Sequence, residues 1–270
     1  MSRDVVDAAR LAACAELGWC DADGELHAIA FTPLVIDETI TAALPFDRTA
    51  TARMLAAANS AVVVLSDSRM ALRGWSPWAQ PVRLYVSADR AGDWTWTGAL
   101  DQEVRKYPPS RLLIDTPIQR REHWWYVPRW VVRLQPAGAA DPIARRGGPD
   151  DAVAFELDSG GLRAWTAAVD DWHAPQVQLT ALDHRTRLGE RAAALAFTHD
   201  FSIPDMERWN SHELVGTRRG TRLEVAKRRG RPTLEPPDGL VKRLSRHWRR
   251  ERGCRRALAS YDADSSVAAT

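Results

Sequence analysis

The strongest constraint on the fold is a β-hairpin signal near the N-terminus. Residues 17–20 are followed by an Asp-Ala-Asp-Gly turn at 21–24 and by an apolar segment at 25–31. Two such segments joined by an Asp-Gly turn are typical of a β-hairpin. Residues 34–43 then carry several β-branched side chains, which favour a further strand that turns near Asp37 and Glu38.

The pattern changes period after this strand pair. Alanine-rich residues 50–58 predict a helix, and a short amphipathic helix is predicted at 4–14. Four further elements are predicted along the chain. They are a buried strand at 61–65, a strand at 81–86, a helix at 101–106 ended by two prolines, and a last strand region at 124–134. Pro128 interrupts that last region and favours an edge strand or a bulge.

The second half also contains both strand and helix signals, but its sequence is not a clear repeat of the first half. Residues 137–151 are rich in Ala, Gly, Pro and Asp and are the predicted linker. Strands are predicted at 152–155, 175–180, 191–198, 212–216 and 221–226, and helices at 203–209 and 240–258. We therefore predict a mainly β protein with helices, of the α+β class. The predicted parts are a first domain at 1–136, the linker at 137–151 and an α+β region at 152–270.

Composition narrows the classes of protein that fit. A chain of 270 residues with 45% hydrophobic content can form one large domain or two small ones. It has no run of about 18 apolar residues and no apolar signal core, so we expect a cytoplasmic protein without a membrane-spanning helix. Three cysteines fit a reducing compartment, and Cys14 and Cys20 are expected to be small apolar residues rather than a disulfide or metal ligands.

Charge is unevenly distributed along the chain. The net charge is +2, yet residues 218–256 contain fifteen Lys and Arg against four Asp and Glu, so the rest is acidic. A basic helix at the C-terminus fits two alternatives: it binds an anionic partner such as nucleic acid, or it packs on the acidic first half. We find no helix-turn-helix, zinc-finger or RNA-binding signature, and we expect no nucleic-acid partner.

The order of the elements in the first half resembles that of a known superfamily. The resemblance rests on residues 17–31, residues 49–64 and residues 129–136 and covers about residues 5–136. In these segments the chain is similar to flavin-binding split β-barrel proteins, a group with pyridoxamine-phosphate-oxidase relatives, deazaflavin-dependent reductases and some haem-binding proteins. The resemblance implies a split β-barrel, and it implies a homodimer with ligand sites shared between subunits. Twelve tryptophans suit such an interface, because aromatic residues concentrate in interface cores.

The resemblance also implies where a cofactor lies. A flavin or deazaflavin phosphate sits near the start of the alanine-rich helix, where exposed N–H groups favour an anion. In this chain the residues at that point are Arg48, Thr49, Thr51 and Arg53. The family's usual lysine falls on Thr51, so a vestigial site is the alternative. Contacts to the ring or substrate are predicted for Trp75, Trp125 and Arg129.

We therefore predict a flavin- or deazaflavin-dependent oxidoreductase acting on a small-molecule substrate. No residue is a convincing acid or base, which suits chemistry carried by the cofactor. The alternatives are a non-catalytic split barrel, with a vestigial site or with haem, and a nucleic-acid-binding protein. His123 is either an acid, base or haem ligand or a hydrogen-bonded residue beside core aromatics. His27 faces either a ligand or the solvent.

Overall fold

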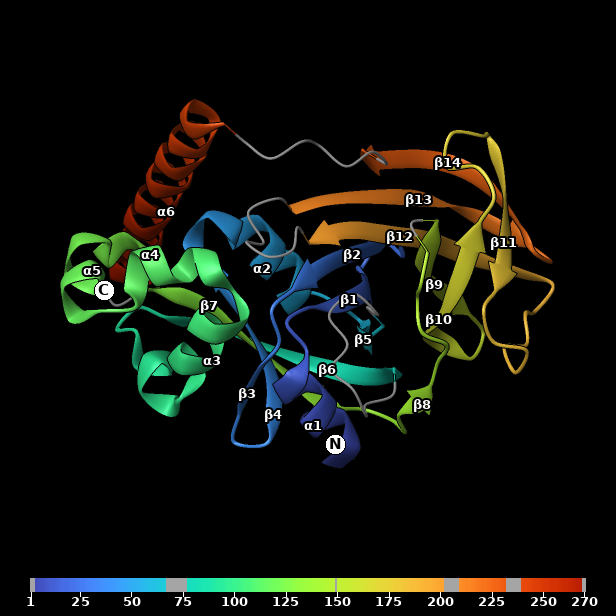
Figure 1. Cartoon of the computed structure of the whole chain (residues 1–270), viewed down its shortest axis with the longest axis horizontal. Helices are drawn as coiled ribbons and strands as arrows, with labels where there is room; N and C mark the ends of the chain where they lie inside the picture. The colour runs from blue at the N-terminus through green and yellow to red at the C-terminus, as the bar shows by residue number, and fades with distance from the viewer. Residues whose placement is uncertain (1–2, 67–76, 149, 202–208, 232–238, 269–270) are drawn as a thin grey trace.

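The structure is a computed structural model that describes residues 3–66, 77–148, 150–201, 209–231 and 239–268. It consists of two antiparallel sheets and a group of helices. Figure 1 shows the first sheet in the middle of the molecule, the second sheet at one end and helices α3 to α6 at the other. The predicted α+β class is confirmed. None of the described helices combines the length and the apolar character needed to cross a bilayer.

The first sheet has eight strands and is curled like half a barrel. Its order is β2-β1-β5-β6-β7-β4-β3, and β8 pairs with β6. The split-barrel architecture implied by the sequence is thereby confirmed for the first half. The strands are β1 (Ala15–Cys20), β2 (Leu26–Phe31), β3 (Leu34–Ile36), β4 (Thr39–Pro45), β5 (Ser60–Leu65), β6 (Trp78–Asp89), β7 (Arg129–Pro136) and β8 (Asp141–Pro142).

One sequence prediction in this sheet is wrong. Residues 124–126 form the 3-10 helix η4 (Trp124–Tyr126), and β7 begins only at Arg129. This strand is central, because it pairs with both β4 and β6. Pro128 therefore lies just before the strand, where its missing N–H removes no ladder hydrogen bond.

The second sheet closes on itself. Its order is β10-β11-β14-β13-β12-β9, and the ends of this order meet in a closed barrel. The strands are β9 (Asp151–Asp158), β10 (Gly161–Val169), β11 (Gln176–Ala181), β12 (Arg191–Phe201), β13 (Trp209–Arg219) and β14 (Arg222–Gly230). Strand β10 was not predicted from the sequence. It is poor in β-branched residues and depends on its pairing with β9. Of the helix predicted at 203–209, residues 203–208 lie outside the described residues and Trp209 begins β13.

The two sheets pack against each other through strand β1. Its odd-numbered side chains, such as Leu17 and Trp19, enter a core that also contains helix α1 (Arg3–Leu11). Its even-numbered positions face the closed barrel, where Cys20 joins a second core with Phe155 and Phe197. Gly18 has no side chain on that face, and a Cβ there would lie 2.2 Å from the Phe155 ring. Both faces of β1 are therefore buried.

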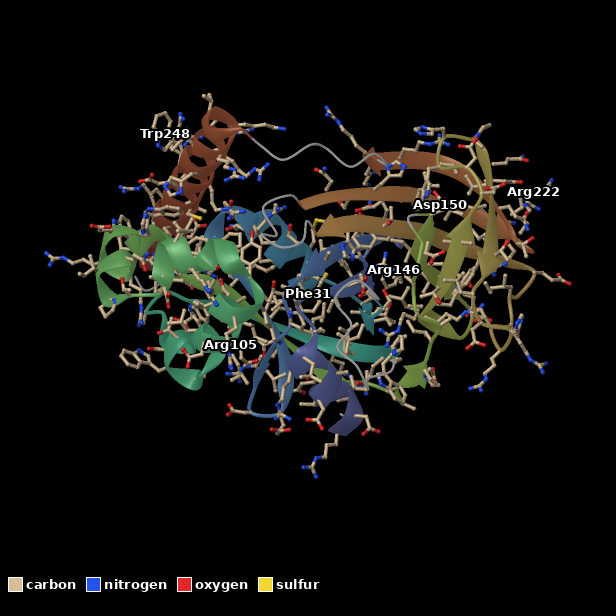
Figure 2. The ribbon with its side chains drawn as sticks, in the orientation of Figure 1. Phe31, Arg105, Arg146, Asp150, Arg222 and Trp248 are labelled. Carbon is tan, nitrogen blue, oxygen red and sulfur yellow. The ribbon has the colours of Figure 1, made fainter. Side chains whose placement is uncertain are left out.

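A buried polar cluster lies between the sheets. Arg146, which belongs to the segment predicted as a linker, donates to Glu16 at 2.6 Å and to the Ser66 hydroxyl at 2.9 Å. The Nε2 atom of His199 lies 3.0 Å from the same Glu16 carboxylate. Figure 2 labels Arg146 between the first sheet and the closed barrel. Polar side chains from both halves thus share one enclosed site.

Helices wall the open end of the first sheet. They are α2 (Thr49–Ala56), α3 (Ala99–Lys106), α4 (Arg111–Ile114), α5 (Pro117–Glu122) and α6 (Leu240–Ala268), with 3-10 helices η1 (Phe46–Arg48), η2 (Asp93–Thr97) and η3 (Pro108–Ser110). The sequence missed α4 and α5, although Pro117 and the capping box of Thr116 and Gln119 mark the start of α5. Helix α6 follows the closed barrel in sequence but packs back on η1 and η4.

Candidate functional site

The candidate site is a cavity of about 230 Å³ at the open end of the first sheet. Its walls come from both halves of the chain. Figure 2 labels Phe31, one of the lining residues, near the middle of the molecule. The lining residues are Ala28, Ile29, Ala30, Phe31, Thr32, Leu34, Ala43, Leu44, Pro45, Asp47, Arg48, Thr51, Glu103, Tyr107, Tyr126, Ser211 and Arg250.

Two of the residues predicted to hold a phosphate line this cavity. Strand β4 ends at Pro45, η1 turns the chain, and α2 begins, which places Arg48 and Thr51 at the cavity wall. The Arg48 side chain is exposed at the wall. Thr51 is half-buried. This part of the wall therefore offers one cation and one hydroxyl to a ligand.

The structure places the other two predicted phosphate residues away from the cavity. The Thr49 hydroxyl donates to the Phe46 carbonyl at 2.6 Å and accepts from the Trp130 indole N–H at 3.0 Å. Arg53 is exposed and lies 3.9 Å from Asp264 of helix α6. Thr49 thus joins η1 to strand β7, and Arg53 points to solvent.

The predicted ring contacts have different surroundings. Arg129 is fully buried behind the cavity wall, with its guanidinium 3.9 Å from the centre of the Tyr126 ring and 3.3 Å from the Glu103 carboxylate. Because Glu103 and Tyr126 both line the cavity, Arg129 supports the wall from behind. Trp125 is buried in the helical core and its ring contacts Tyr126. Trp75 lies outside the described residues.

Sequence reasoning missed the groups that complete the cavity. Tyr107 and Tyr126 come from the helical segment, Ser211 from β13 and Arg250 from α6. Arg250 had one signal: Cys254 and Leu258 follow it at steps of four, and this spacing marks the buried face of a helix. For Tyr107, Tyr126 and Ser211, no local sequence pattern shows that the elements that carry them meet strands β2 and β4 at the cavity.

Burial changes the proton affinity of two groups near this wall. It raises the pKa of Tyr126 to about 12, so the phenol stays protonated at neutral pH and can donate a hydrogen bond. It lowers the pKa of Lys106 to about 7. The Lys106 amine donates to the carbonyls of Ala9 at 2.6 Å and Pro33 at 2.5 Å, next to the lining residues Thr32 and Leu34.

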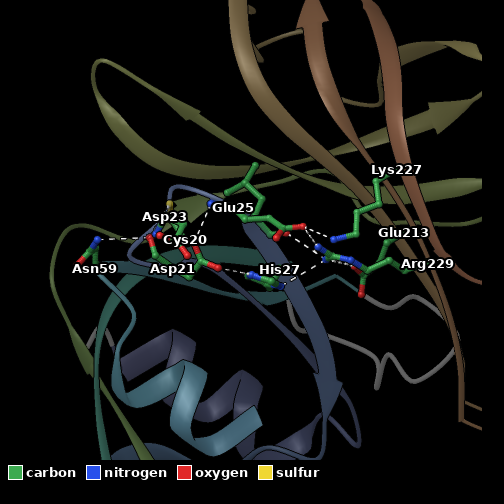
Figure 3. A network of polar contacts seen from close by, with 10 residues as sticks. Cys20, Asp21, Asp23, Glu25, His27, Asn59, Glu213, Lys227 and Arg229 are labelled. Atoms are coloured by element: carbon green, nitrogen blue, oxygen red, sulfur yellow. Dashed lines mark hydrogen bonds and ion pairs between the residues drawn. The ribbon is translucent and has the colours of Figure 1, made fainter. Parts of the chain in front are cut away.

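The two histidines considered as functional residues lie elsewhere. His27 stacks on Trp19 and contacts Asp21 at 2.7 Å. Figure 3 shows this contact in a network that continues through Glu25 to Lys227 and Arg229 of β14. The Glu25–Lys227 ion pair measures 2.7 Å, so the network joins the β1–β2 hairpin to the closed barrel.

His123 belongs to the contact between η4 and α6. Its ring packs edge-on against Trp125 and against His247 of α6, with centroid distances of 6.1 and 5.8 Å. Its Nδ1 atom lies 3.1 Å from the Gln119 carbonyl. These contacts correspond to the alternative of a hydrogen-bonded histidine beside core aromatics.

Comparisons with known proteins add similarity of fold only. No protein-family model and no curated protein matches the chain. A conserved hypothetical protein of Mycobacterium tuberculosis aligns with 15% identity over 53% of this chain and 84% of its own, at a TM-score of 0.38. The haem storage protein HutZ of Vibrio cholerae aligns with 12% identity over 52% and 93%, at 0.37.

A third solved structure has a longer alignment. It is a pyridoxamine 5'-phosphate oxidase-related, FMN-binding protein of Nostoc punctiforme, 10% identical over 67% of this chain and 96% of its own, with a TM-score of 0.32. At these values no residue role is transferred from the three proteins. The split-barrel assignment rests on the strand order and the curled sheet of this chain.

Proposed function

We propose that the cavity binds the phosphate-bearing end of a flavin or deazaflavin coenzyme and that the chain is an oxidoreductase of this type. One observation carries the proposal: Arg48 and Thr51 share a single cavity with the aromatic side chains of Phe31, Tyr107 and Tyr126. A guanidinium and a hydroxyl are suited to a phosphate oxygen, and aromatic and apolar walls are suited to a flat organic ligand.

The size of the cavity limits how much of the cofactor it encloses. Pockets for whole small-molecule ligands typically measure about 300–1,000 Å³, whereas this cavity measures about 230 Å³. We therefore expect the phosphate end to be enclosed and the ring to lie at the mouth. A second copy of the chain would cover the ring there, and we propose a homodimer. Light scattering that finds only monomer at micromolar concentration would contradict the shared site.

In this proposal the bound flavin supplies the hydride chemistry, and the chain binds and orients it. Arg48 and Thr51 hold the anionic end, while Tyr126 keeps its proton and presents an uncharged wall. Arg129 fixes the position of that wall through Glu103 and the Tyr126 ring. The substrate is then expected to be a small molecule that reaches the ring at the mouth of the cavity.

Titration with FMN tests the proposal. The wild-type protein should bind FMN with at least micromolar affinity, and its absorption spectrum should be that of a flavin rather than the Soret band of haem. Arg48→Ala should weaken binding about tenfold or more, because a hydrogen bond to a charged group contributes roughly 1.5–3 kcal/mol. Arg53→Ala is the matched control, since Arg53 does not line the cavity. Failure of the wild type to bind FMN or deazaflavin coenzyme would overturn the proposal.

A further inference from the structure

We propose that Arg250, on the C-terminal helix, is a second anion-binding residue of the cavity and makes it selective for phosphorylated ligands. The inference rests on the proposed function, because it concerns the same cavity. It adds that the binding site is incomplete without helix α6, which follows the closed barrel in the sequence and lies outside the segment that resembles the split barrel.

Helix α6 is held in a defined position at the cavity. Cys254 and Leu258 are buried in the same core as Phe46 and Tyr126. Tyr261 packs edge-on against Phe46, with the ring centroids 5.8 Å apart. Arg250 lies one turn before Cys254 on the docked face of the helix, and only 26% of its side chain is exposed. Core packing thus places its guanidinium at the cavity wall.

The cavity contains more positive than negative charge available to a ligand. Glu103 is already engaged by Arg129 from behind the wall. Asp47 is the other carboxylate of the lining, and it is 3.9 Å from the Arg250 Nε atom. This separation is too long for a hydrogen bond, so the Nε–H donor is not used by Asp47. One carboxylate facing two guanidinium groups favours an anionic ligand.

The neighbours of Arg250 keep it charged. Burial lowers the pKa of Arg250, but the negative charge of Asp47 and a hydrogen bond with Tyr107 oppose this effect, and the pKa lies above its ordinary value. Arg250 and Arg48 approach from different elements, α6 and η1, and can contact different oxygens of one group. A phosphate monoester, with up to two negative charges and three terminal oxygens, matches two guanidinium groups better than a neutral hydroxyl does.

The experiment compares FMN with riboflavin, which has the same ring and ribityl chain but no phosphate. The wild type should bind FMN at least about tenfold more tightly than riboflavin. Arg250→Gln should reduce FMN affinity about tenfold and leave riboflavin affinity unchanged, so that the preference for FMN falls by about tenfold and only the contribution of Arg48 and Thr51 remains. Arg250→Lys should retain part of it, because the positive charge remains.

Two further variants separate charge from folding. Arg249→Ala removes an exposed arginine from the same helix and should leave both affinities unchanged. Asp47→Asn should strengthen FMN binding, because a negative charge leaves the cavity. Circular dichroism should show that Arg250→Gln retains the wild-type helix content.

The outcomes distinguish this inference from the proposed function. Equal affinities of the wild type for FMN and riboflavin would overturn the role of Arg250 while leaving flavin binding intact. An equal loss of both affinities in Arg250→Gln would also overturn it, since the residue would then act through packing. Failure of the wild type to bind either flavin would overturn the proposed function itself.

Discussion

The two sheets differ in how they use their interior. The closed barrel is filled by side chains, with Trp165, Leu179 and Leu214 packed among small alanines in its core. The curled first sheet does not close, and at its open end the strands β2 and β4 form part of a cavity walled by helices. A small barrel has room only for its own side chains, whereas a split one leaves space that other elements must line. The candidate site therefore lies at the open sheet, with part of its wall supplied by the second half.

The buried ion pairs of the two halves differ in the same way, in whether they lie beside the cavity. In the closed barrel, Glu156 of β9 and Arg218 of β13 form an ion pair, and both side chains are fully buried. Arg218 also donates to the Gly189 carbonyl at 3.0 Å. In the first half the buried pair of Glu103 and Arg129 lies beside the cavity, and Glu103 forms part of its lining. The Glu156–Arg218 pair is therefore absent from the cavity lining, whereas the Glu103–Arg129 pair contributes Glu103 to it.

The largest expected effect comes from breaking the pair in the closed barrel. Glu156→Gln keeps the size of the side chain but leaves Arg218 buried without its counter-charge, which costs about 3–5 kcal/mol of unfolding free energy. Urea denaturation measures this loss. The matched control is Glu224→Gln, because Glu224 pairs with Arg219 on the surface of the same barrel at 3.6 Å. Such exposed pairs contribute about 0–1 kcal/mol.

FMN affinity should respond differently when the buried pair of each half is broken. The folded fraction of Glu156→Gln should bind FMN as the wild type does, since Glu156 does not line the cavity. Glu103→Gln should lower stability and change FMN affinity, because it removes a charge from the cavity lining and disturbs Arg129 and the Tyr126 wall together. Unchanged FMN affinity in Glu103→Gln would contradict the contrast between the pairs.

A smaller effect is expected where the two sheets meet. Gly18→Val places methyl groups where the Phe155 ring now lies, and overpacking of this kind costs about 1–3 kcal/mol. Phe155→Ala removes the obstructing ring, so the double variant should lose less stability than the two single variants together. Gly147→Ala is the control, because a Cβ at Gly147 meets no atom within 4 Å. Strict additivity in urea denaturation would show that Gly18 does not set the distance between the sheets.

The first half was more predictable from the sequence than the second for a physical reason. Its hairpin, the strand at 61–65 and the alanine-rich helix depend on local patterns of turn residues and apolar side chains. Closure of the second sheet depends on β10, whose nine residues have few β-branched side chains and are held by pairing with β9 and β11. Pairing between strands distant in sequence leaves no local pattern.

The candidate site was predictable only where it is contiguous in sequence. Arg48 and Thr51 lie at one strand-to-helix connection, and both line the cavity. Helix geometry already separates Thr51 from Arg53, because residues two apart in a helix lie about 200° apart around its axis. Tyr107 and Ser211 meet the cavity only through tertiary packing, so their places were not predictable from neighbouring residues. For Arg250, the spacing to Cys254 and Leu258 indicates the buried face of a helix but not the cavity that this face reaches.

The smallest expected effect concerns the helix that joins the two halves. Burial lowers the pKa of His247 from its ordinary value of 6.5, and His123 and Arg250 add to this shift while Glu251 opposes it. The unfolded chain therefore binds a proton more readily than the folded one. Stability from neutral His247 is fully present above about pH 6.5 and is lost as the pH falls below that value.

The His247→Gln variant tests this dependence, because its side chain remains uncharged throughout. Between pH 7.5 and 5.0, thermal unfolding should shift less in this variant than in the wild type, and hydrogen exchange should show the difference in α6. An identical shift in both proteins would mean that protonation of His247 is not linked to unfolding, so that its contacts with Trp125 and His123 do not depend on the neutral form of the ring.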